Sequence, residues 1–154
     1  MHKNNCFKPK FLSILFPLSV LMLACNQTEQ RKSHPGHSAE KNFYPGKGSG
    51  PVKNIVLSDI NAALARDGEK IFNEKCVACH RITDEKLIGP GLRGVTRRRT
   101  AEWIMNQILD PLGMTSTDSL SRELLSVYLT QMTPMELSEQ QARSVLEYFR
   151  MNDF

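Results

Sequence analysis

Apolar side chains recur at helical spacing in four stretches of the 154-residue chain, all of them after residue 57. The first stretch ends just before Cys76, and the other three begin after Thr100, at about Asp118 and after Ser138. Their helical positions are Leu64, Gly68, Ile71 and Phe72; Trp103, Ile104, Gln107 and Ile108; Leu120, Leu124, Val127 and Tyr128; and Ala142, Val145, Leu146 and Phe149. This period predicts four amphipathic helices, and no stretch shows the alternation of a strand. We therefore expect one all-α domain over residues 57–154.

The predicted ends of these helices carry capping signals. Thr100 has a side chain that can cap the second helix, and Asp110-Pro111 stops it. Ser138-Glu139-Gln140-Gln141 has the pattern of a capping box at the start of the last helix.

The N-terminal segment predicts export from the cytoplasm. Lysines precede an apolar stretch from Phe11 to Ala24 that is short for a membrane span, so residues 1–24 are expected to be a signal peptide. Residues 21–25, Leu-Met-Leu-Ala-Cys, resemble a bacterial lipobox, which implies cleavage before Cys25 and lipidation of that cysteine. An ordinary secretory signal, or an uncleaved anchor interrupted by Pro17, remains the alternative. We expect a lipid-anchored protein on the periplasmic side of the cell envelope.

Residues 25–56 are polar and rich in Gly, Pro and Ser, with few side chains to bury. Such a segment does not offset its ordering entropy, so we expect a lipid anchor followed by a flexible linker.

Removing the signal peptide changes the charge and the cysteine count. The formal net charge of +4 includes three lysines from the first 24 residues, so the remainder is nearly neutral and gives no reason to expect nucleic-acid binding. Of the four cysteines, Cys6 leaves with the signal peptide and Cys25 is assigned to the lipid. Only Cys76 and Cys79 remain for chemistry.

The motif Cys76-Val77-Ala78-Cys79-His80 predicts one covalently bound haem c. Two thiols at this spacing can add to the haem vinyl groups, while the histidine that follows binds the iron. A zinc site would need two further ligands, and the only histidines that complete it, His34 and His37, lie far upstream in the predicted linker. A thioredoxin-like dithiol would need its cysteines at a helix start, whereas here the predicted helix precedes them.

A methionine opposite His80 would favour ferrous iron and raise the reduction potential. Met105 falls inside a predicted helix, Met151 lies near the C-terminus and Met114 lies in an expected loop, which makes them weaker candidates. Met132 lies in a proline-stiffened loop between the third and fourth predicted helices and is the favoured ligand, with Met135 as the alternative.

From about residue 65 to residue 149 the sequence resembles a class I monohaem cytochrome c. Gly68 and Phe72 match residues of the family's first helix, and Tyr148 matches an aromatic residue of its last helix. The resemblance implies that these helices cross and that the fold encloses one haem.

The same resemblance implies roles for two loops. Gly89-Pro90 resembles the loop on the proximal side, where the Pro90 carbonyl accepts a hydrogen bond from the ligand histidine and thereby fixes its ring. Residues 132–138 resemble the segment that carries the distal ligand. The family often has proline directly after the methionine, whereas Thr133 stands here, so Met135 remains open.

A narrower resemblance concerns residues 48–53 and 89–106, which look like cytochromes found with nitrous oxide reductases in denitrifying bacteria. It implies delivery of electrons to a periplasmic reductase; a periplasmic oxidase and a membrane quinol-oxidising complex are the other expected redox partners.

Basic residues surround the motif in the sequence. One or more of the arginines at 93 and 97–99 are candidates to pair with the haem propionates, as Trp103 or Tyr128 are through hydrogen bonds. Lys70, Lys75, Arg81 and Lys86 are candidates to steer an acidic partner.

Two functions remain. The favoured one is an electron carrier without catalytic residues; the alternative is a haem sensor or a peroxidase-like enzyme whose sixth iron position is open. No acid–base constellation accompanies the motif, because His34 and His37 lie in the linker and His80 is consumed by iron.

Overall fold

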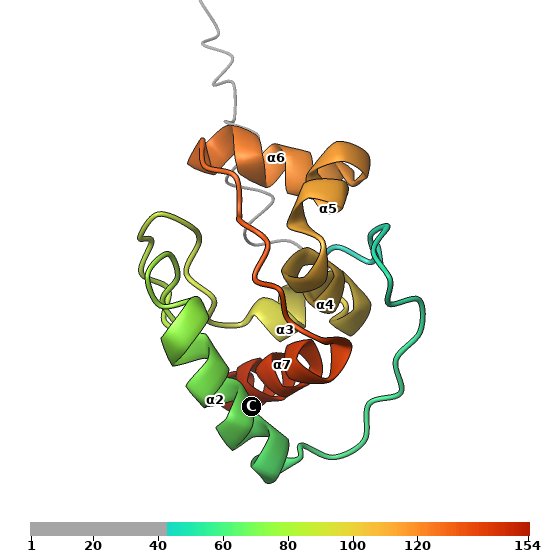
Figure 1. Ribbon diagram of the computed structural model, residues 1–154, viewed down its shortest axis with the longest axis vertical. Helices are drawn as coiled ribbons and strands as arrows, with labels where there is room; N and C mark the ends of the chain where they lie inside the picture. Colours follow the sequence, from blue (N-terminus) through green and yellow to red (C-terminus); the bar gives the residue numbers. More distant parts are fainter. Residues whose placement is uncertain (1–42) are drawn as a thin grey trace, which may run out of the picture. The chain divides into compact units, whose positions relative to one another are not determined.

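The computed structural model describes residues 43–154, which form six helices and no strand beyond one bridge between Tyr44 and Arg99. The helices are α2 (Ala62–Lys75), α3 (Val95–Arg98), α4 (Ala101–Leu109), α5 (Pro111–Thr117), α6 (Ser119–Tyr128) and α7 (Glu139–Asp153) (Figure 1). The expected all-α fold is confirmed for this part of the chain. The predicted signal peptide and Cys25 lie outside the described residues.

The four predicted helices are present, and their predicted caps form. The Thr100 side chain accepts a hydrogen bond from the Trp103 amide, and the capping box of α7 is complete. Asp110 both ends α4 and caps α5, since its side chain accepts from the Gly113 amide. Pro111 is tolerated at the start of α5 because the first amides of a helix need no intrahelical partner.

Two short helices were not predicted. α3 and α5 have four and seven residues, too few for an apolar period to show in the sequence. The expectation that Met114 lies in a loop is wrong: it lies in α5, is fully buried, and its sulfur accepts a hydrogen bond from the Ser49 amide at 3.4 Å.

Helices α2 and α7 pack against each other, as the predicted crossing requires (Figure 1). At the crossing, a Cβ on Gly68 would lie 2.0 Å from the Ser144 carbonyl oxygen, so no larger residue fits without separating the helices. Phe72 of α2 packs on Tyr148 and Phe149 of α7, with ring centroids 5.5 and 5.9 Å apart. This contact forms one end of a core that α4 and α5 complete with Trp103, Ile104, Met105, Ile108 and Met114.

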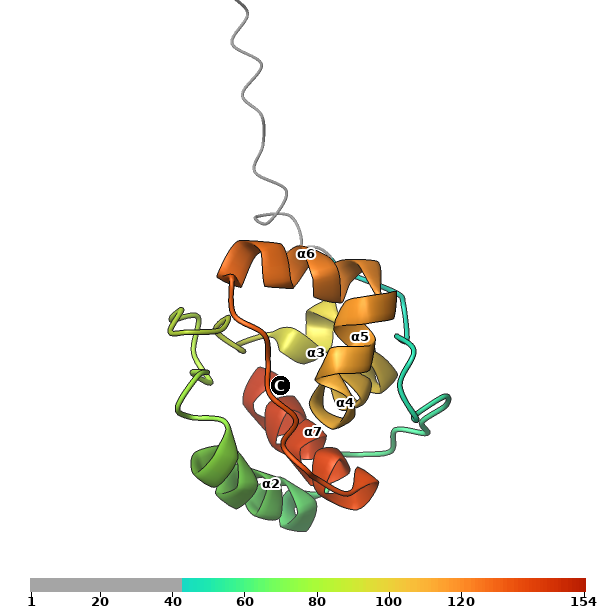
Figure 2. The same cartoon turned by 45° about the horizontal axis from the view of Figure 1, so that its top comes forward.

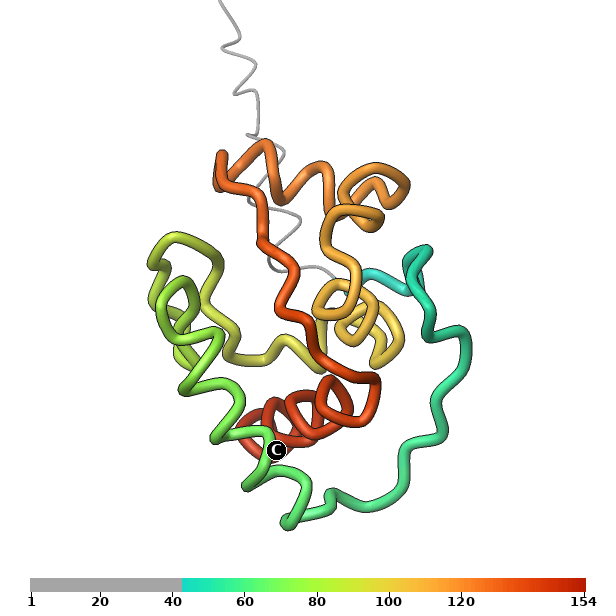
Figure 3. Tube along the Cα trace, in the orientation of Figure 1, coloured from blue at the N-terminus to red at the C-terminus, as the bar shows by residue number. Residues whose placement is uncertain are grey.

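Residues 43–61 form a strap, which Figure 3 shows as an extended segment (cyan to green) that passes around one side of the helices and then enters α2. The buried Asn106 of α4 bonds both backbone groups of Val52, at 2.8 Å each, and the carbonyl of Lys47. Val52 itself is 3% exposed. Part of the predicted linker thus lies against α4 at Lys47 and Val52, because Asn106 supplies backbone partners that the linker sequence does not reveal.

A buried carboxylate fastens the other end of the strap to α7. Glu147 has no exposed area; it pairs with Arg143 and Arg150, each at 2.7 Å, and accepts from the Asn61 amide. Burial by itself would raise the pKa of Glu147, but the two arginines and the Asn61 amide hold it below its ordinary value. The carboxylate thus stays ionised and links the start of α2 to α7.

Residues 129–138 connect α6 to α7. Figures 1 and 2 both show this segment descending between the loop of residues 76–94 and helices α4 and α5. None of the helices in residues 43–154 is long and apolar enough to cross a membrane.

Candidate haem site

The motif cysteines lie where α2 ends. The Cys76 amide still bonds the Phe72 carbonyl, and the amides of Cys79 and His80 both turn back to the Cys76 carbonyl, at 3.0 and 2.9 Å. This turn holds both thiols and the imidazole at one end of α2. Both cysteines are free thiols and half-buried.

Burial raises the pKa of the Cys76 thiol to about 11, with Cys79 adding to the rise and Lys75 opposing it. Cys76 is therefore a protonated thiol at neutral pH.

A short loop fixes the ring of His80. Its Nδ1 lies 3.0 Å from the Pro90 carbonyl oxygen, and since a carbonyl only accepts, Nδ1 carries the proton and Nε2 keeps its lone pair. Burial lowers the pKa of His80, while the bond to Pro90 opposes this shift. The imidazole is thus neutral, as an iron ligand must be.

Gly89 lets this loop approach the ring. A Cβ on Gly89 would lie 2.5 Å from His80 Cε1 and 2.9 Å from Nδ1, closer than real contacts allow. The Gly89 amide also donates to the Cys79 carbonyl at 2.9 Å. Glycine is therefore required immediately before Pro90, a signal that the Gly-Pro pair carries in the sequence.

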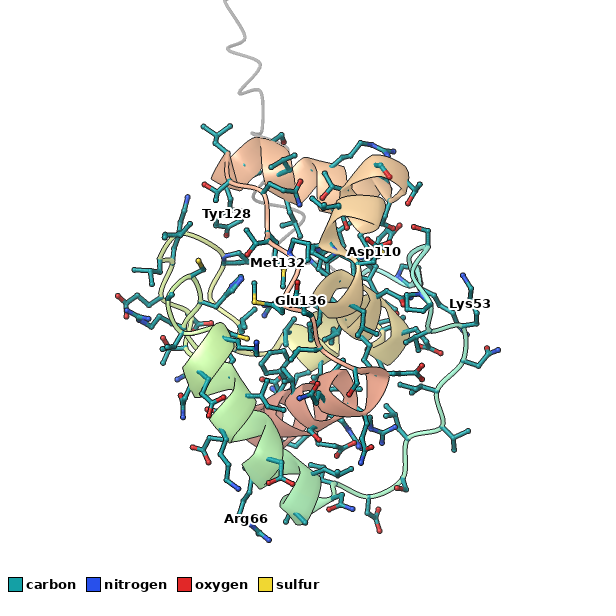
Figure 4. All side chains as sticks on the ribbon, viewed as in Figure 1. Lys53, Arg66, Asp110, Tyr128, Met132 and Glu136 are labelled. Atoms are coloured by element: carbon teal, nitrogen blue, oxygen red, sulfur yellow. The ribbon has the colours of Figure 1, made fainter. Side chains whose placement is uncertain are left out.

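Met132 lies in the connecting segment, near the centre of the view in Figure 4. It is half-buried, and its sulfur accepts a hydrogen bond from Gln107 Nε2 of α4 at 3.9 Å. Met135 is also half-buried, and its carbonyl accepts from Lys75 Nζ at 3.4 Å. Both candidate ligands therefore remain partly accessible.

The other methionines of the described domain are less suited to bind iron. Met105 and Met114 are buried at 1% and 0% exposure inside helices of the core, and Met151 projects from the exposed end of α7. The contact with Gln107 distinguishes Met132 from these three, and the sequence pattern alone did not reveal it. Gln107 falls on a predicted helix with no signal of function.

Several of the polar side chains proposed to meet the haem propionates have partners within the protein. The Trp103 ring N–H donates to Asp118 Oδ1 at 3.1 Å, and the Arg99 guanidinium lies over the Trp103 ring. Arg97 lies over the Phe154 ring, and Arg98 donates to the Arg93 carbonyl. Lys86 lies over the Tyr128 ring, with its Nζ 4.6 Å from the ring centroid.

The donor set can also be compared with that of a metal-ion site. Within residues 43–154, no group of three or more His, Cys, Asp or Glu side chains lies together to hold a metal ion. One imidazole with a free Nε2, two adjacent thiols and a thioether in the facing segment instead fit a haem.

The fold and the site define a small all-α protein that holds one haem through a pair of thioethers. Comparison with known proteins agrees. The profile of the cytochrome c family matches residues 65–152, and the chain belongs to this family. It carries one covalent c-type haem at Cys76 and Cys79. Haem-based electron transfer is the general function of the family.

Among solved structures, cytochrome c from Rhodothermus marinus is similar, at 50% identity and a TM-score of 0.66 over 68% of this chain and 90% of that one. A cytochrome c-type cyt cy of Rhodobacter capsulatus is 49% identical over 37 residues, which are 24% of this chain and 19% of that protein. A cytochrome c-553-like protein of Synechocystis is 40% identical over 27% of this chain and 40% of its own length. The chain thus spans less than half of these two relatives.

Proposed function

We propose that this chain is an electron carrier of the periplasm, tethered by a lipid at Cys25, whose haem iron is bound by His80 and Met132. The observation that carries the proposal is the Met132 segment lying opposite the loop that fixes His80. A thioether in that place would fill the sixth iron position and leave no site for a substrate.

When bound, the haem supplies a one-electron couple between ferric and ferrous iron. The residues of this chain do the rest. Cys76 and Cys79 would keep the group attached, Pro90 holds the His80 ring, and the half-buried Met132 would close the distal side to water and small ligands.

The alternative is a sensor or peroxidase-like enzyme with an open sixth position, and spectroscopy of the ferric holoprotein separates the two. Methionine-ligated ferric haem has a weak far-red absorption band, which we expect here. Its absence, together with rapid binding of cyanide or imidazole, would favour the alternative.

Two matched variants test which methionine binds. We expect Met132→Ala to lose the far-red band and to bind imidazole readily, and Met135→Ala to keep the band. The reverse result would assign the ligand to Met135, whose segment Lys75 holds by the backbone.

The tether is proposed from the sequence around Cys25. In a bacterial host that lipidates exported proteins, we expect the full chain in the membrane fraction and Cys25→Ser released into the soluble periplasm. Cys6→Ser is the matched control and should remain with the membrane, because it lies in the segment that is removed.

A nitrous oxide reductase is the proposed electron acceptor, supported by the resemblance of residues 48–53 and 89–106. Lys75 and Lys86, both exposed beside the motif, would steer an acidic partner. We expect the rate of electron transfer to fall as ionic strength rises. A rate independent of salt excludes this steering, and the absence of electron transfer to the purified reductase excludes the partner.

A further inference from the structure

A chain of hydrogen bonds leads from the Met132 sulfur into the core between α4 and α6. Gln107 of α4 donates from Nε2 to Met132 Sδ, and its Oε1 accepts from the Ser121 hydroxyl at 2.7 Å. Ser121 lies in the first turn of α6 and its amide donates to Asp118, whose side chain caps that helix. Three segments that are distant in the sequence therefore meet behind the sulfur.

The Gln107 carbonyl lies towards Ser121 and its amide N–H lies towards Met132. The Ser121 hydroxyl has one proton and two acceptors within reach, Gln107 Oε1 at 2.7 Å and Asp118 Oδ1 at 3.1 Å. Asp118 Oδ1 already accepts from the Ser121 amide and the Trp103 ring N–H. The contact with Gln107 Oε1 is the shorter of the two, and with Oε1 on the Ser121 side the amide N–H, rather than the carbonyl, lies towards the Met132 sulfur.

A second glutamine contacts Met132 differently. Gln131 Nε2 donates to the Met132 carbonyl at 3.1 Å, and also to Thr115 and Pro111 of α5. Gln131 therefore holds the backbone of the segment, whereas Gln107 contacts the sulfur itself. Variants of Gln131 therefore report the effect of loosening the segment, and variants of Gln107 report the effect of losing the contact with the sulfur.

We propose that Gln107 is a positioning residue for the axial ligand: its amide N–H, oriented by Ser121, holds the Met132 sulfur and raises the reduction potential of the haem. The inference rests on the proposed Met132 ligation and deepens it. An N–H donor draws electron density from the thioether and places positive charge near the iron, which favours the ferrous form. Half-burial of Gln107 strengthens the effect, since less water screens it.

The test compares midpoint potentials and far-red bands of holoprotein variants. We expect Gln107→Leu to lower the equilibrium constant for reduction about threefold to tenfold, where tenfold is about 59 mV for one electron. Gln107→Glu keeps the size but loses the donor and adds negative charge, so it should lower the constant further. Ser121→Ala frees the amide to rotate and should give a smaller decrease of about twofold, with Ser126→Ala on the same helix as its unchanged control.

Gln131→Leu is the matched control for a structural effect. We expect it to lower stability while leaving the far-red band in place. The proposal is overturned if Gln107→Leu leaves the potential unchanged, or if Gln131→Leu changes the potential and the band as much as Gln107→Leu does.

Failure of the ligation itself has a different signature. If Met132→Ala keeps the far-red band, the assignment of Met132 is wrong and this inference falls with it. If Met132→Ala loses the band while Gln107→Leu changes neither band nor potential, only the role of Gln107 is wrong.

Discussion

The two sides of the haem site are built from different kinds of contact. On the proximal side, residues 76–94 hold His80 through partners close in the sequence: Pro90 is ten residues away, and the Gly89 amide bonds the Cys79 carbonyl. On the distal side, residues 129–138 are held by remote helices. Gln107 is 25 residues from Met132, and Lys75 is 60 residues from Met135.

Two of the distal contacts are also long: Gln107 Nε2 lies 3.9 Å from the Met132 sulfur, and Lys75 Nζ lies 3.4 Å from the Met135 carbonyl oxygen. In addition, Leu129 and Glu136 at the ends of the distal segment adopt left-handed backbone with φ of 55° and 54°, which costs a residue other than glycine free energy. The comparison teaches that the proximal ligand is locked by its own loop, whereas the distal ligand depends on the assembled fold.

The largest effect should come from disturbing the proximal lock. Gly89→Ala places a methyl group against the His80 ring, so we expect a loss of about 3 kcal/mol in unfolding free energy and poor yield of low-spin holoprotein. Urea unfolding and the absorption spectrum measure both effects. Ile88→Ala, at the exposed neighbouring residue, is the control. A normal spectrum and stability for Gly89→Ala would show that the loop is not rigid.

This difference explains what the sequence could predict. The haem motif and the helix caps are local patterns, so the sequence alone predicts them, and the role of Gly89-Pro90 follows from the resemblance to the family. The role of Gln107 was not readable, because its partner lies in another segment and nothing in its own helix marks it.

The strap is a second case in which a partner remote in the sequence determines the structure. Its composition predicts flexibility, yet Asn106 of α4 satisfies the backbone of Val52 from 54 residues away. Glycines at 48 and 50 permit this contact, since a Cβ there would lie 2.4 Å from the Met114 side chain and 2.5 Å from Asn106 Oδ1. Composition describes a segment by itself and does not include the surface that receives it.

A second, smaller effect tests whether the distal side depends on the assembled fold. Asp118 caps α6 and accepts from Trp103 and Tyr44, so Asp118→Ala removes the cap and leaves two donors unsatisfied. We expect a loss of about 2 kcal/mol in unfolding free energy and easier displacement of Met132 by imidazole. Asp59→Ala, an exposed aspartate of the strap, is the control. If Asp118→Ala bound imidazole with the affinity of the wild type, Asp118 would have no influence on the distal ligand.

The ionisation of Asp118 adds a pH dependence to the distal side. Burial by itself would raise the pKa of Asp118, but hydrogen bonds from Ser121, Trp103 and Tyr44 hold it below its ordinary value. A carboxylate whose folded pKa is lowered stabilises the fold fully above its unfolded pKa, about 3.9, and less as pH falls through the folded value.

We therefore expect Asp118→Asn to be less stable than the wild type at neutral pH by about 1 kcal/mol, and the difference to shrink below about pH 4. Urea unfolding of both proteins at several pH values measures it, and comparing the pair cancels the titration of other carboxylates. A difference that stays constant with pH would mean that charge on Asp118 contributes nothing.

The smallest effect concerns the strain at the ends of the distal segment. Leu129 is 84% exposed and ends α6 in left-handed backbone, so Leu129→Gly removes the strain without removing a core contact. We expect a gain of about 0.5 to 1 kcal/mol in unfolding free energy, reduced by the greater freedom of glycine in the unfolded chain. Leu112→Gly, also exposed but within helix α5, is the control and should destabilise. A loss of stability for Leu129→Gly would mean that the distal segment carries no strain at Leu129. The two sides of the site would then differ only in how remote their contacts are in the sequence.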